Sequence, residues 1–579
     1  GFFTVMHPTN PDVMLAESQG GNLSRVDLIS MERARRRPTA RFDPDGERQE
    51  PRWNWDTPVL ISVHDDNTVY IGSNVLYKSI DLGDSFDPIS PDLTWAIDRD
   101  TLPIMGIVGG MPQMSRNDGQ SSYGNLTAIG ESPRDAALIY TGSDDGRVHV
   151  TRDGGATWTD ITDRFEDLPA FTYVTRIVTS GEAAGRVHIA FDGHRNDDFN
   201  PYIYSSENSG QDWELMTSGL PMSPISALTE HPDNANLLFV GNEMGVYVSA
   251  DVGQNWVRMK NNLPTVPVDD IKIHPRENDL VLGTHGRGVW IMEDITPLER
   301  LDAGAVAANA FLFPVRRATS YNSYNPQGWT PGIYAAPNPR AGARIRYHLA
   351  TSVEDLTLRV TSATGGAIRE LDAPGSSGLN EVIWDLRLVE DDANGNAMDP
   401  GPRVMPGTYL VELTTGTDVV QTEVVVRLDP RVELARRPMR TRYLAMLESY
   451  RMSGPVSSAE DAIDAMRDAV DELEALVSAD DEAINGQIAT VREELDVLAD
   501  DLDAASLGAG IWGAIQSVTG PASADQLWMI EHSWDTAPAV IGRINQSLAD
   551  TVPTLLRLGY TAAAMPKLPD PVAPPQRGG

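Results

Sequence analysis

Paired apolar strands set the pattern of the first 300 residues. Each unit consists of a polar turn, an apolar strand ending in Gly or Ala, a turn bearing Gly or Asn, and a second apolar strand. The strands run about 4–6 residues with alternating apolar and polar positions, as half-buried β-structure requires. A repeat of roughly 40–50 residues is typical of four-stranded blades arranged radially, so the pattern predicts a β-propeller, complete or partial. The six units begin near His7, Val63, Ser132, Val187, His231 and His274.

A second motif, Ser/Thr-x-Asp-x-Gly-x-x-Trp, recurs within the same region. Its Gly allows a backbone with positive φ, and its Asp or Asn accepts hydrogen bonds from nearby backbone N–H groups. The hydroxyl makes similar local bonds, and the aromatic ring is expected to cover the base of the hairpin. All four roles are structural, so we interpret the motif as a hairpin cap without catalytic function. Its copies are Ser79, Asp81, Gly83 and Phe86; Thr151, Asp153, Gly155 and Trp158; Ser206, Asn208, Gly210 and Trp213; and Ser249, Asp251, Gly253 and Trp256.

The motif resembles the Asp-box, or bacterial neuraminidase (BNR) repeat, of sialidases, xyloglucan-type hydrolases and sortilin-type propellers. Segments 191–213 and 283–298 resemble, more specifically, large secreted bacterial proteins described as sortilin-like or glycosyl-hydrolase-like repeat propellers. The resemblance covers most of the chain and implies an extracytoplasmic location: secreted, periplasmic or at the cell surface. It also implies further propeller upstream. It assigns no catalytic residue, because the hydrolase label rests on the repeat alone.

Residues 301–430 follow a different β pattern. Short alternating strands with Gly-rich turns predict a β-sandwich of roughly 100 residues after a linker. The arrangement of "NEVIWDLR" and "MPGTYLVEL" is similar to the Ig-like domain of flagellar hook-capping proteins, which implies a spacer or docking module. Together with the first 300 residues, this makes the chain a mainly β multidomain protein.

From residue 431 the apolar period becomes helical, which predicts a small α-helical bundle over 431–565. Ser458 and Asp461 have the spacing of a capping box and predict the start of the first helix. The loop "SADDE" predicts an antiparallel pair, and segments near 522–535 and 538–559 are expected to complete the bundle. The apolar faces hold Ile463, Met466, Val470, Leu473 and Val477, and then Ile484, Ile488, Val491, Leu495, Leu498 and Leu502.

Composition narrows the classes of partner. A chain of 579 residues with a net charge of −37 presents an acidic surface, which argues against nucleic acid and anionic lipid as partners. Without cysteine, the chain has no disulfide, no thiolate metal site and no cysteine nucleophile. No apolar run reaches the roughly 20 residues of a membrane span. The start shows no signal-peptide pattern, so we expect a mature or trimmed piece of a longer chain. A Pro-rich tail, 566–579, is expected to be extended.

Two sets of polar residues are candidates for chemistry in the propeller. His7, His231 and His274 occupy equivalent positions in different blades, so a radial fold holds them apart and we interpret them as turn residues instead of metal ligands. A polar insert at 192–200 offers a binding loop, since propellers often carry binding residues on such inserts. The alternative is that its aspartates pair with arginines to hold the loop. The residues concerned are His194, Arg195, Asp197 and Asp198.

A calcium site is a further hypothesis. Asp392, Asn394 and Asn396 have the i, i+2, i+4 spacing of a calcium loop, and Asp399 lies just beyond. The Gly and terminal Glu of a full EF-hand loop are absent, and the alternative is a polar hairpin loop of the sandwich. Beyond calcium, we expect no cofactor.

These patterns favour a non-catalytic extracytoplasmic binding or scaffold protein that presents propeller loops and appended modules to protein partners. One such partner is a chain or region that completes the propeller. Two alternatives stay open. The first is a carbohydrate-active glycoside hydrolase, sialidase- or xyloglucanase-like, although no pair of carboxylates is singled out among the 83 acidic residues. The second is a structural subunit of a large envelope assembly. Fold alone does not decide among them.

Overall fold

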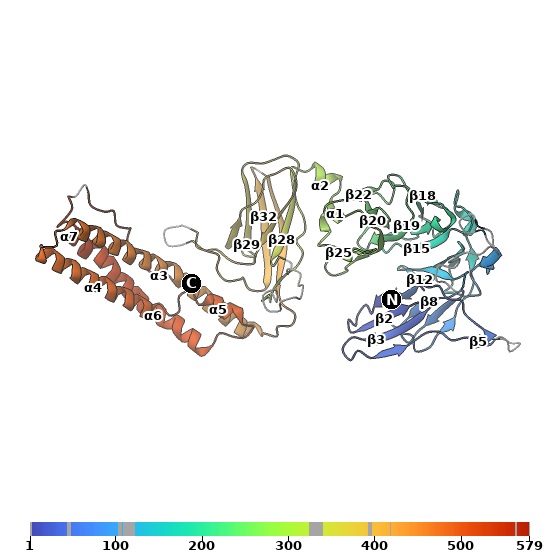
Figure 1. The fold of residues 1–579 in the computed structure, drawn as a ribbon, viewed down its shortest axis with the longest axis horizontal. Coiled ribbons are helices and arrows are strands. Elements are labelled where there is room, and N and C mark those ends of the chain that lie inside the picture. Colours follow the sequence, from blue (N-terminus) through green and yellow to red (C-terminus); the bar gives the residue numbers. More distant parts are fainter. Residues whose placement is uncertain are drawn as a thin grey trace. The chain divides into compact units, whose positions relative to one another are not determined.

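The computed structural model describes residues 3–42, 48–101, 103, 107, 122–323, 338, 340–391, 397–416, 418–561 and 564–577. The chain divides into two compact units, Gly1–Glu299 and Arg300–Gly579. The first unit is built of β-sheets, and the second joins a β-sandwich to long helices (Figure 1).

Six antiparallel sheets of three or four strands make up most of the described part of the first unit, and we call them the first to sixth blades. The first blade holds β1 (Thr4–Met6), β2 (Val13–Ser18), β3 (Asn22–Asp27) and β4 (Arg33–Arg35), and the second holds β7 (Val59–Ile61), β8 (Val69–Gly72), β9 (Leu76–Ser79) and β10 (Asp87–Pro88). The third holds β11 (Leu126–Ser132), β12 (Asp135–Ser143), β13 (Val148–Thr151) and β14 (Thr159–Asp160). The fourth holds β15 (Tyr173–Thr179), β16 (Val187–Asp192), β17 (Tyr202–Ser206) and β18 (Glu214–Leu215). The fifth holds β19 (Ile225–His231), β20 (Asn234–Asn242), β21 (Gly245–Ser249) and β22 (Val257–Met259), and the sixth holds β23 (Val268–Ile273), β24 (Leu280–Thr284) and β25 (Val289–Met292).

Short elements connect the blades. A small hairpin of β5 (Arg41–Phe42) and β6 (Arg48–Gln49) follows the first blade. Single helical turns are η1 (Arg99–Thr101), η2 (Thr162–Arg164) and η3 (His194–Asn196), and the sixth blade is followed by α1 (Thr296–Arg300) and α2 (Ala303–Ala307).

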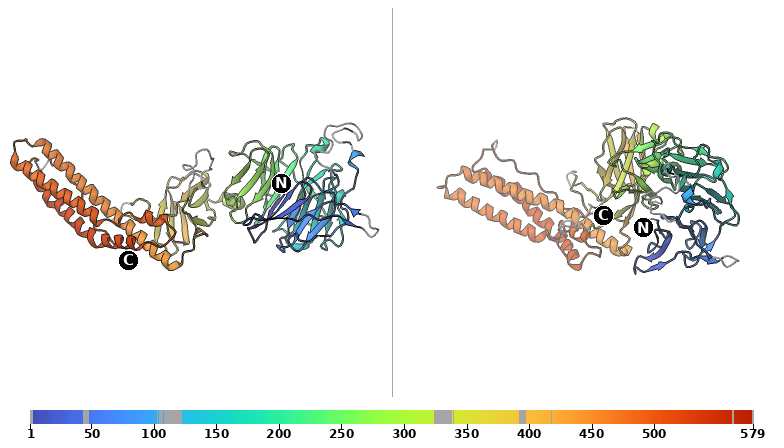
Figure 2. Two further views of the ribbon diagram at one scale, coloured as in Figure 1. Left: turned by 60° about the horizontal axis from the view of Figure 1, so that its bottom comes forward. Right: turned by 45° about the vertical axis from the view of Figure 1, so that its right-hand side comes forward.

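The blades follow one another around a common centre (Figure 2). The first strands of successive blades lie side by side, from β11 through β15 and β19 to β23. Hydrogen bonds join these inner strands: Thr127 Oγ1 donates to the Val174 carbonyl at 2.6 Å, and Thr229 Oγ1 donates to the Ile271 carbonyl at 2.8 Å. The prediction of a β-propeller is confirmed, with six blades among the described residues.

A glycine or alanine near the end of each blade's second strand explains how closely the blades pack. An added Cβ on Gly142 would stand 2.3 Å from Val174 Cγ1, and one on Gly241 would stand 2.4 Å from the Val268 carbonyl oxygen. Both contacts are made by the inner strand of the next blade. A small residue is therefore required where one blade lies directly on its neighbour.

The second unit begins with two sheets that share one core. One sheet has the order β26 (Ala310–Leu312), β28 (Ala343–Leu349) and β31 (Gly378–Trp384). The other has the order β27 (Ala318–Ser320), β33 (Asp418–Leu428), β32 (Gly407–Thr415), β29 (Leu356–Ser362) and β30 (Ala367–Leu371), with β27 parallel to β33. Trp384 and Tyr347, both fully buried, lie in the common core. This is the expected β-sandwich.

A helical bundle completes the second unit. Its elements are α3 (Arg436–Leu476), α4 (Glu482–Ala505), α5 (Trp512–Ser517), α6 (Ala524–Gln546), the π-helical turn η5 (Ser547–Thr551) and α7 (Val552–Leu556). The predicted apolar faces of α3 and α4 pack together, with Met466, Leu473 and Leu495 buried in one core. The prediction of helices at the C-terminal end is confirmed.

Two expectations about helix boundaries are wrong. Ser458 and Asp461 do not begin a helix, because α3 runs back to Arg436 and passes through Pro455. Tertiary packing sustains that early part of α3: Tyr450 is buried in the sandwich core, and its hydroxyl donates to the Asp399 carbonyl at 2.8 Å. Likewise, α6 continues through Pro538, so the two expected segments form one helix.

A capping box does occur at the start of α6. The Ser523 side chain accepts from the Gln526 backbone N–H, and the Gln526 side chain accepts from the Ser523 N–H. Residues 566–577 of the Pro-rich tail form no helix or strand, and Val572 pairs through both backbone groups with the Asn545 side chain. Among the described residues, no helix is long and apolar enough to cross a membrane.

Candidate functional site

The four copies of the recurrent motif form closed hairpin turns. Ser79 Oγ accepts from the Gly83 N–H at 2.8 Å and donates to Asp81 Oδ1 at 2.7 Å, and Asp81 Oδ1 also accepts from the Ser85 N–H at 2.8 Å. Bonds from Ser85 and Ser79 lower the pKa of Asp81 to about 2. The same hydroxyl-to-glycine bond measures 2.9 Å in the third blade, 2.9 Å in the fourth and 2.8 Å in the fifth. The polar groups of these turns are used locally.

The aromatic residues of the motif do more than cover their own hairpins. Trp158 Nε1 donates to the Ile89 carbonyl at 2.9 Å, and Trp256 Nε1 donates to the Met216 carbonyl at 2.9 Å. In both cases the acceptor belongs to the preceding blade. The Trp213 ring likewise contacts Phe165, with ring centroids 4.8 Å apart. The tryptophans therefore tie neighbouring blades together, which single-motif reasoning missed because the acceptor lies in another repeat.

The insert between β16 and β17 lies at the opposite end of its blade from the hairpin turn that follows β17. His194 Nδ1 lies 2.6 Å from Asp192 Oδ2, and this bond raises the pKa of His194. Arg195 stacks over the Tyr173 ring at 5.8 Å. Asp197 adopts a left-handed backbone with φ of 63°.

Asp198 holds the insert through neutral partners. It accepts from the Tyr202 hydroxyl at 2.8 Å and from the Asn200 N–H at 3.0 Å. The insert is thus fixed by local bonds and half exposes His194, which leaves it a candidate binding loop.

Charged groups converge at the centre of the propeller. Arg176 Nη2, from the fourth blade, donates to the Asp269 carbonyl of the sixth blade at 3.0 Å. Burial raises the pKa of Asp56, and the Arg176 charge opposes that shift. Glu17 is 1% exposed, and its Oε1 accepts from the Gly21 N–H at 3.0 Å. Burial raises the pKa of Glu17 to about 7, the Gly21 bond opposes this, and the Asp56 charge adds to it.

The three repeat histidines act in turns, as their equivalent positions predict. His7 Nδ1 accepts from the Asn10 N–H at 3.0 Å, His231 Nδ1 accepts from the Asp233 N–H at 3.1 Å, and His274 Nδ1 accepts from the Arg276 N–H at 3.2 Å. Each ring caps the turn that follows it. The residues that the structure describes contain no group of three or more side chains arranged to hold a metal ion.

The calcium hypothesis falls largely outside the described residues. Asp392, Asn394 and Asn396 are not among them, and Asp399 offers its backbone carbonyl to Tyr450.

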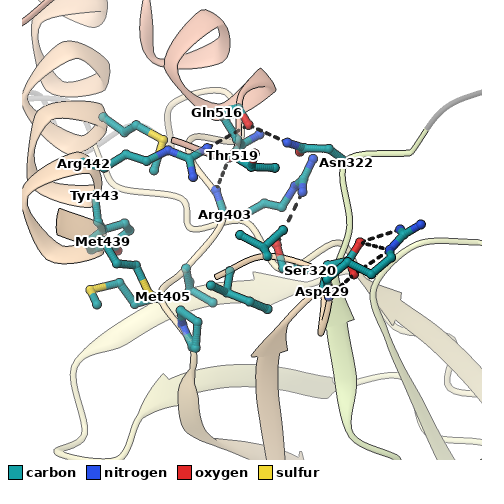
Figure 3. A pocket seen from close by; sticks show the side chains of 16 residues that line it. Ser320, Asn322, Arg403, Met405, Asp429, Met439, Arg442, Tyr443, Gln516 and Thr519 are labelled. Atoms are coloured by element: carbon teal, nitrogen blue, oxygen red, sulfur yellow. Dashed lines mark hydrogen bonds and ion pairs between the residues drawn. The ribbon is translucent and has the colours of Figure 1, made fainter. Parts of the chain in front are cut away.

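A pocket of about 400 Å³ lies in the second unit, between the sandwich and the helices (Figure 3). Arg403 donates to the Ser320 hydroxyl and the Tyr321 carbonyl. Arg442 donates to the Ile515 and Gln516 carbonyls at 3.0 Å, which caps the end of α5. Burial lowers the pKa of both guanidinium groups. Both arginines donate to groups of the sandwich or of α5. We therefore interpret the pocket as part of the packing contact between the sandwich and the helices.

No family model and no curated protein matches the sequence. Solved structures similar to this chain include PorZ, an essential bacterial surface component of the type-IX secretion system of Porphyromonas gingivalis (13% identity, TM-score 0.33, 72% of this chain and 58% of that one). A GH74 xyloglucanase from Xanthomonas campestris has 13% identity and TM-score 0.35, over 72% of this chain and 65% of that one. YCF48 from Cyanidioschyzon merolae has 10% identity and TM-score 0.31, over 51% of this chain and 94% of that one. The chain spans less than two thirds of the first two structures.

Proposed function

We propose that this chain is a non-catalytic extracytoplasmic scaffold whose propeller docks a β-sheet of a protein partner against its sixth blade. The observation that carries this proposal is an apolar face that the sixth blade leaves exposed. Val289 is 68% exposed and Ile291 is 59% exposed, and both lie on β25. Opposite them on β24 are Gly283 and Val281. We call these four residues the sixth-blade face.

The fifth blade shows what such a face is for. Register places Phe239, Gly241 and Val246 where the sixth blade has Val281, Gly283 and Val289. Phe239 and Val246 are buried against the sixth blade. On the sixth blade, the same apolar positions meet no further blade among the described residues. An added Cβ on Gly283 would find its nearest neighbour, Asp270 Cβ, at 3.6 Å. The residues of a packed blade are thus present on a surface that is open to a partner.

Site-directed crosslinking tests the proposal. The chain has no cysteine, so Ile291→Cys and a control, Ile80→Cys, each accept a single photo-crosslinker. Ile80 is 71% exposed in the second blade, away from the sixth-blade face. We expect one discrete protein adduct from position 291, none from position 80, and loss of the adduct when Val289→Lys is added. Equal labelling at both positions, or no adduct at position 291, would overturn the proposal.

The carboxyl pair near the propeller centre favours a second candidate, a glycoside hydrolase. Burial raises the pKa of the Glu17 carboxyl to about 7, and a carboxyl group that keeps its proton near neutral pH can serve as a general acid. Full-length protein would be assayed on sialosides and β-glucans beside Glu17→Gln, Asp56→Asn and the exposed control Glu182→Gln. Turnover that is lost in Glu17→Gln and in Asp56→Asn, that is kept in Glu182→Gln, and that falls above pH 7 in the parent chain would establish the hydrolase and displace the scaffold.

A further inference from the structure

The fifth and sixth blades differ at one buried tryptophan. Trp256 stands in the hairpin before β22 and is 4% exposed. Its indole lies against the fourth blade, where Met216 accepts its N–H. The sequence around this acceptor, "MTSGLP" at 216–221, returns as "MKNNLP" at 259–264, at the corresponding end of the fifth blade.

Each apolar neighbour of Trp256 has a counterpart one blade further on. Strand register and the repeated sequence pair Met216 with Met259, Leu220 with Leu263, Ile203 with Val246, Leu238 with Leu280, Val240 with Leu282, and Tyr247 with Trp290. The first member of each pair surrounds Trp256. The second members line a cavity of about 170 Å³ between the fifth and sixth blades. We call this cavity the tryptophan slot.

The sixth blade lines one side of the slot but has no counterpart of Trp256 to fill it. Where β21 ends in Ser249 and continues into the hairpin with Trp256, β25 ends in Met292 and the chain turns into α1. The size of the slot suits one aromatic side chain, since an apolar cavity of about 150 Å³ accepts a benzene-sized ring. The Met259 carbonyl corresponds to the Met216 carbonyl, which accepts the Trp256 N–H.

The edge of β25 runs beside the slot. The Thr284 N–H donates to the Gly288 carbonyl, so alternation along the antiparallel pair turns the backbone groups of Val289 and Ile291 away from β24. In the other blades, the third strand is covered by a fourth strand of two or three residues. Among the described residues, no strand pairs with this edge of β25. An apolar edge of this kind is a template for an added strand.

We propose that the tryptophan slot and the edge of β25 together bind an extended segment of a partner protein that carries a tryptophan immediately before a short strand. The indole fills the slot, and the strand pairs antiparallel with Val289–Ile291, as β22 pairs with β21. This inference rests on the proposed function only in assigning a protein ligand. It uses the slot and the backbone edge of β25, whereas the docking proposal uses the side chains of the sixth-blade face.

The chain itself provides the probe. A peptide with the sequence of residues 249–259, "SADVGQNWVRM", contains the hairpin, Trp256 and the strand. Its binding to the full chain would be measured by calorimetric titration, beside the same peptide with Trp256→Ala. We expect the alanine peptide to bind roughly 10-fold more weakly or worse, because truncating a buried aromatic anchor removes most of its contribution.

Two matched substitutions test the slot independently of the peptide. Leu263→Phe places a ring in the slot, whereas Leu220→Phe meets the space that Trp256 already fills. We expect Leu263→Phe to keep the melting temperature at or above that of the parent chain and to weaken peptide binding at least roughly 10-fold. Leu220→Phe should lower the melting temperature by several degrees.

The outcomes separate this inference from the proposed function. Equal binding of the two peptides, binding unaffected by Leu263→Phe, or no binding of either peptide overturns the slot, whatever the crosslinking at position 291 shows. If position 291 gives no adduct but peptide binding still depends on the tryptophan, only the proposal for the sixth-blade face is overturned. The chain could also dimerise without peptide, and Leu263→Phe could abolish that dimer. In that case a second copy of the chain occupies the slot, and the assignment to a partner protein is overturned.

Discussion

The fifth and sixth blades are built from nearly the same residues and end differently. Both carry a glycine near the end of the second strand and apolar residues on the third, with matched register. The fifth blade then makes its motif turn, places Trp256 against the fourth blade and closes with β22. The sixth blade turns into α1 after Met292. The comparison teaches that the last repeat can keep the apolar residues that pack between blades. It nevertheless lacks counterparts of Trp256 and of the fourth strand β22, which complete the fifth blade.

The largest expected effect concerns the tryptophan that the fifth blade has and the sixth lacks. Trp256→Ala removes a buried indole and its bond to the Met216 carbonyl, so we expect a loss of about 3–5 kcal/mol in the free energy of unfolding. Denaturant unfolding followed by circular dichroism measures it. The exposed neighbour Val257→Ala should change stability by less than about 0.5 kcal/mol. Similar small losses for both variants would show that the indole does not join the blades.

The repeated glycine gives the second prediction. Gly241→Ala forces a Cβ against the Val268 carbonyl, so we expect a loss of about 1–3 kcal/mol or more. Gly283→Ala, at the matching position of the sixth blade, has room for the Cβ and should cost less than about 0.5 kcal/mol. Thermal unfolding of the two variants is the measurement. An equal cost at both positions would contradict the difference between the blades.

The motif hydroxyl gives a smaller effect. Ser249 Oγ accepts from the buried Gly253 N–H, and Ser249→Ala leaves that donor without a partner. We expect a loss of about 1–2 kcal/mol in unfolding experiments. Met292 occupies the matching place in the sixth blade, and Met292→Leu should stay within about 1.5 kcal/mol because its volume is conserved. A Ser249→Ala variant as stable as the parent would show that the turn does not need the hydroxyl.

The smallest effect is a pH dependence of stability that arises from Asp251 in the fifth blade. The sixth blade has no motif turn and therefore no equivalent of this effect. Partial burial acts to raise the pKa of Asp251, but bonds from Asn255 and Ser249 outweigh it and hold the pKa below its ordinary 3.8. A depressed pKa stabilises the fold above pH 3.8, and the stabilisation is lost as the pH falls through the folded-state pKa. Asp251→Asn should fold at pH 7, since Asn208 fills the same place in the fourth blade, and should lose less stability on acidification than the parent. Parallel acid unfolding curves for the two proteins would refute this.

Periodicity predicted the propeller because each strand pair carries its own local signal. The hairpin turns were equally predictable, since Ser79, Asp81 and Gly83 bond within a few residues of one another. The hydrogen-bond acceptor of Trp256 could not be predicted, because the Met216 carbonyl lies in a different repeat and the motif carries no information about it. The tryptophan slot could be recognised only once the strand register of the blades was known and the repeated sequence had aligned Leu263 with Leu220.

Helix boundaries show the same limit. The period through Ile463 and Leu473 predicted the later part of α3, whereas its earlier part depends on contacts of Tyr450 with the sandwich. The spacing of Ser458 and Asp461 imitates a capping box inside a continuous helix, and a local pattern cannot reveal that the preceding residues are also helical. The effect of the Asp56 charge on the pKa of Glu17 was missed for a related reason, since Glu17 belongs to the first blade and Asp56 directly precedes the second.

Backbone hydrogen exchange at β25 tests most directly whether the sixth blade is open to an added strand. The amides of Val289 and Ile291 would be followed in the full chain alone, with saturating 249–259 peptide, and with its Trp256→Ala form. The account predicts that the tryptophan peptide slows exchange at both amides and that the alanine peptide leaves them close to the free rate. Unchanged exchange with either peptide, or equal slowing by both, would contradict it.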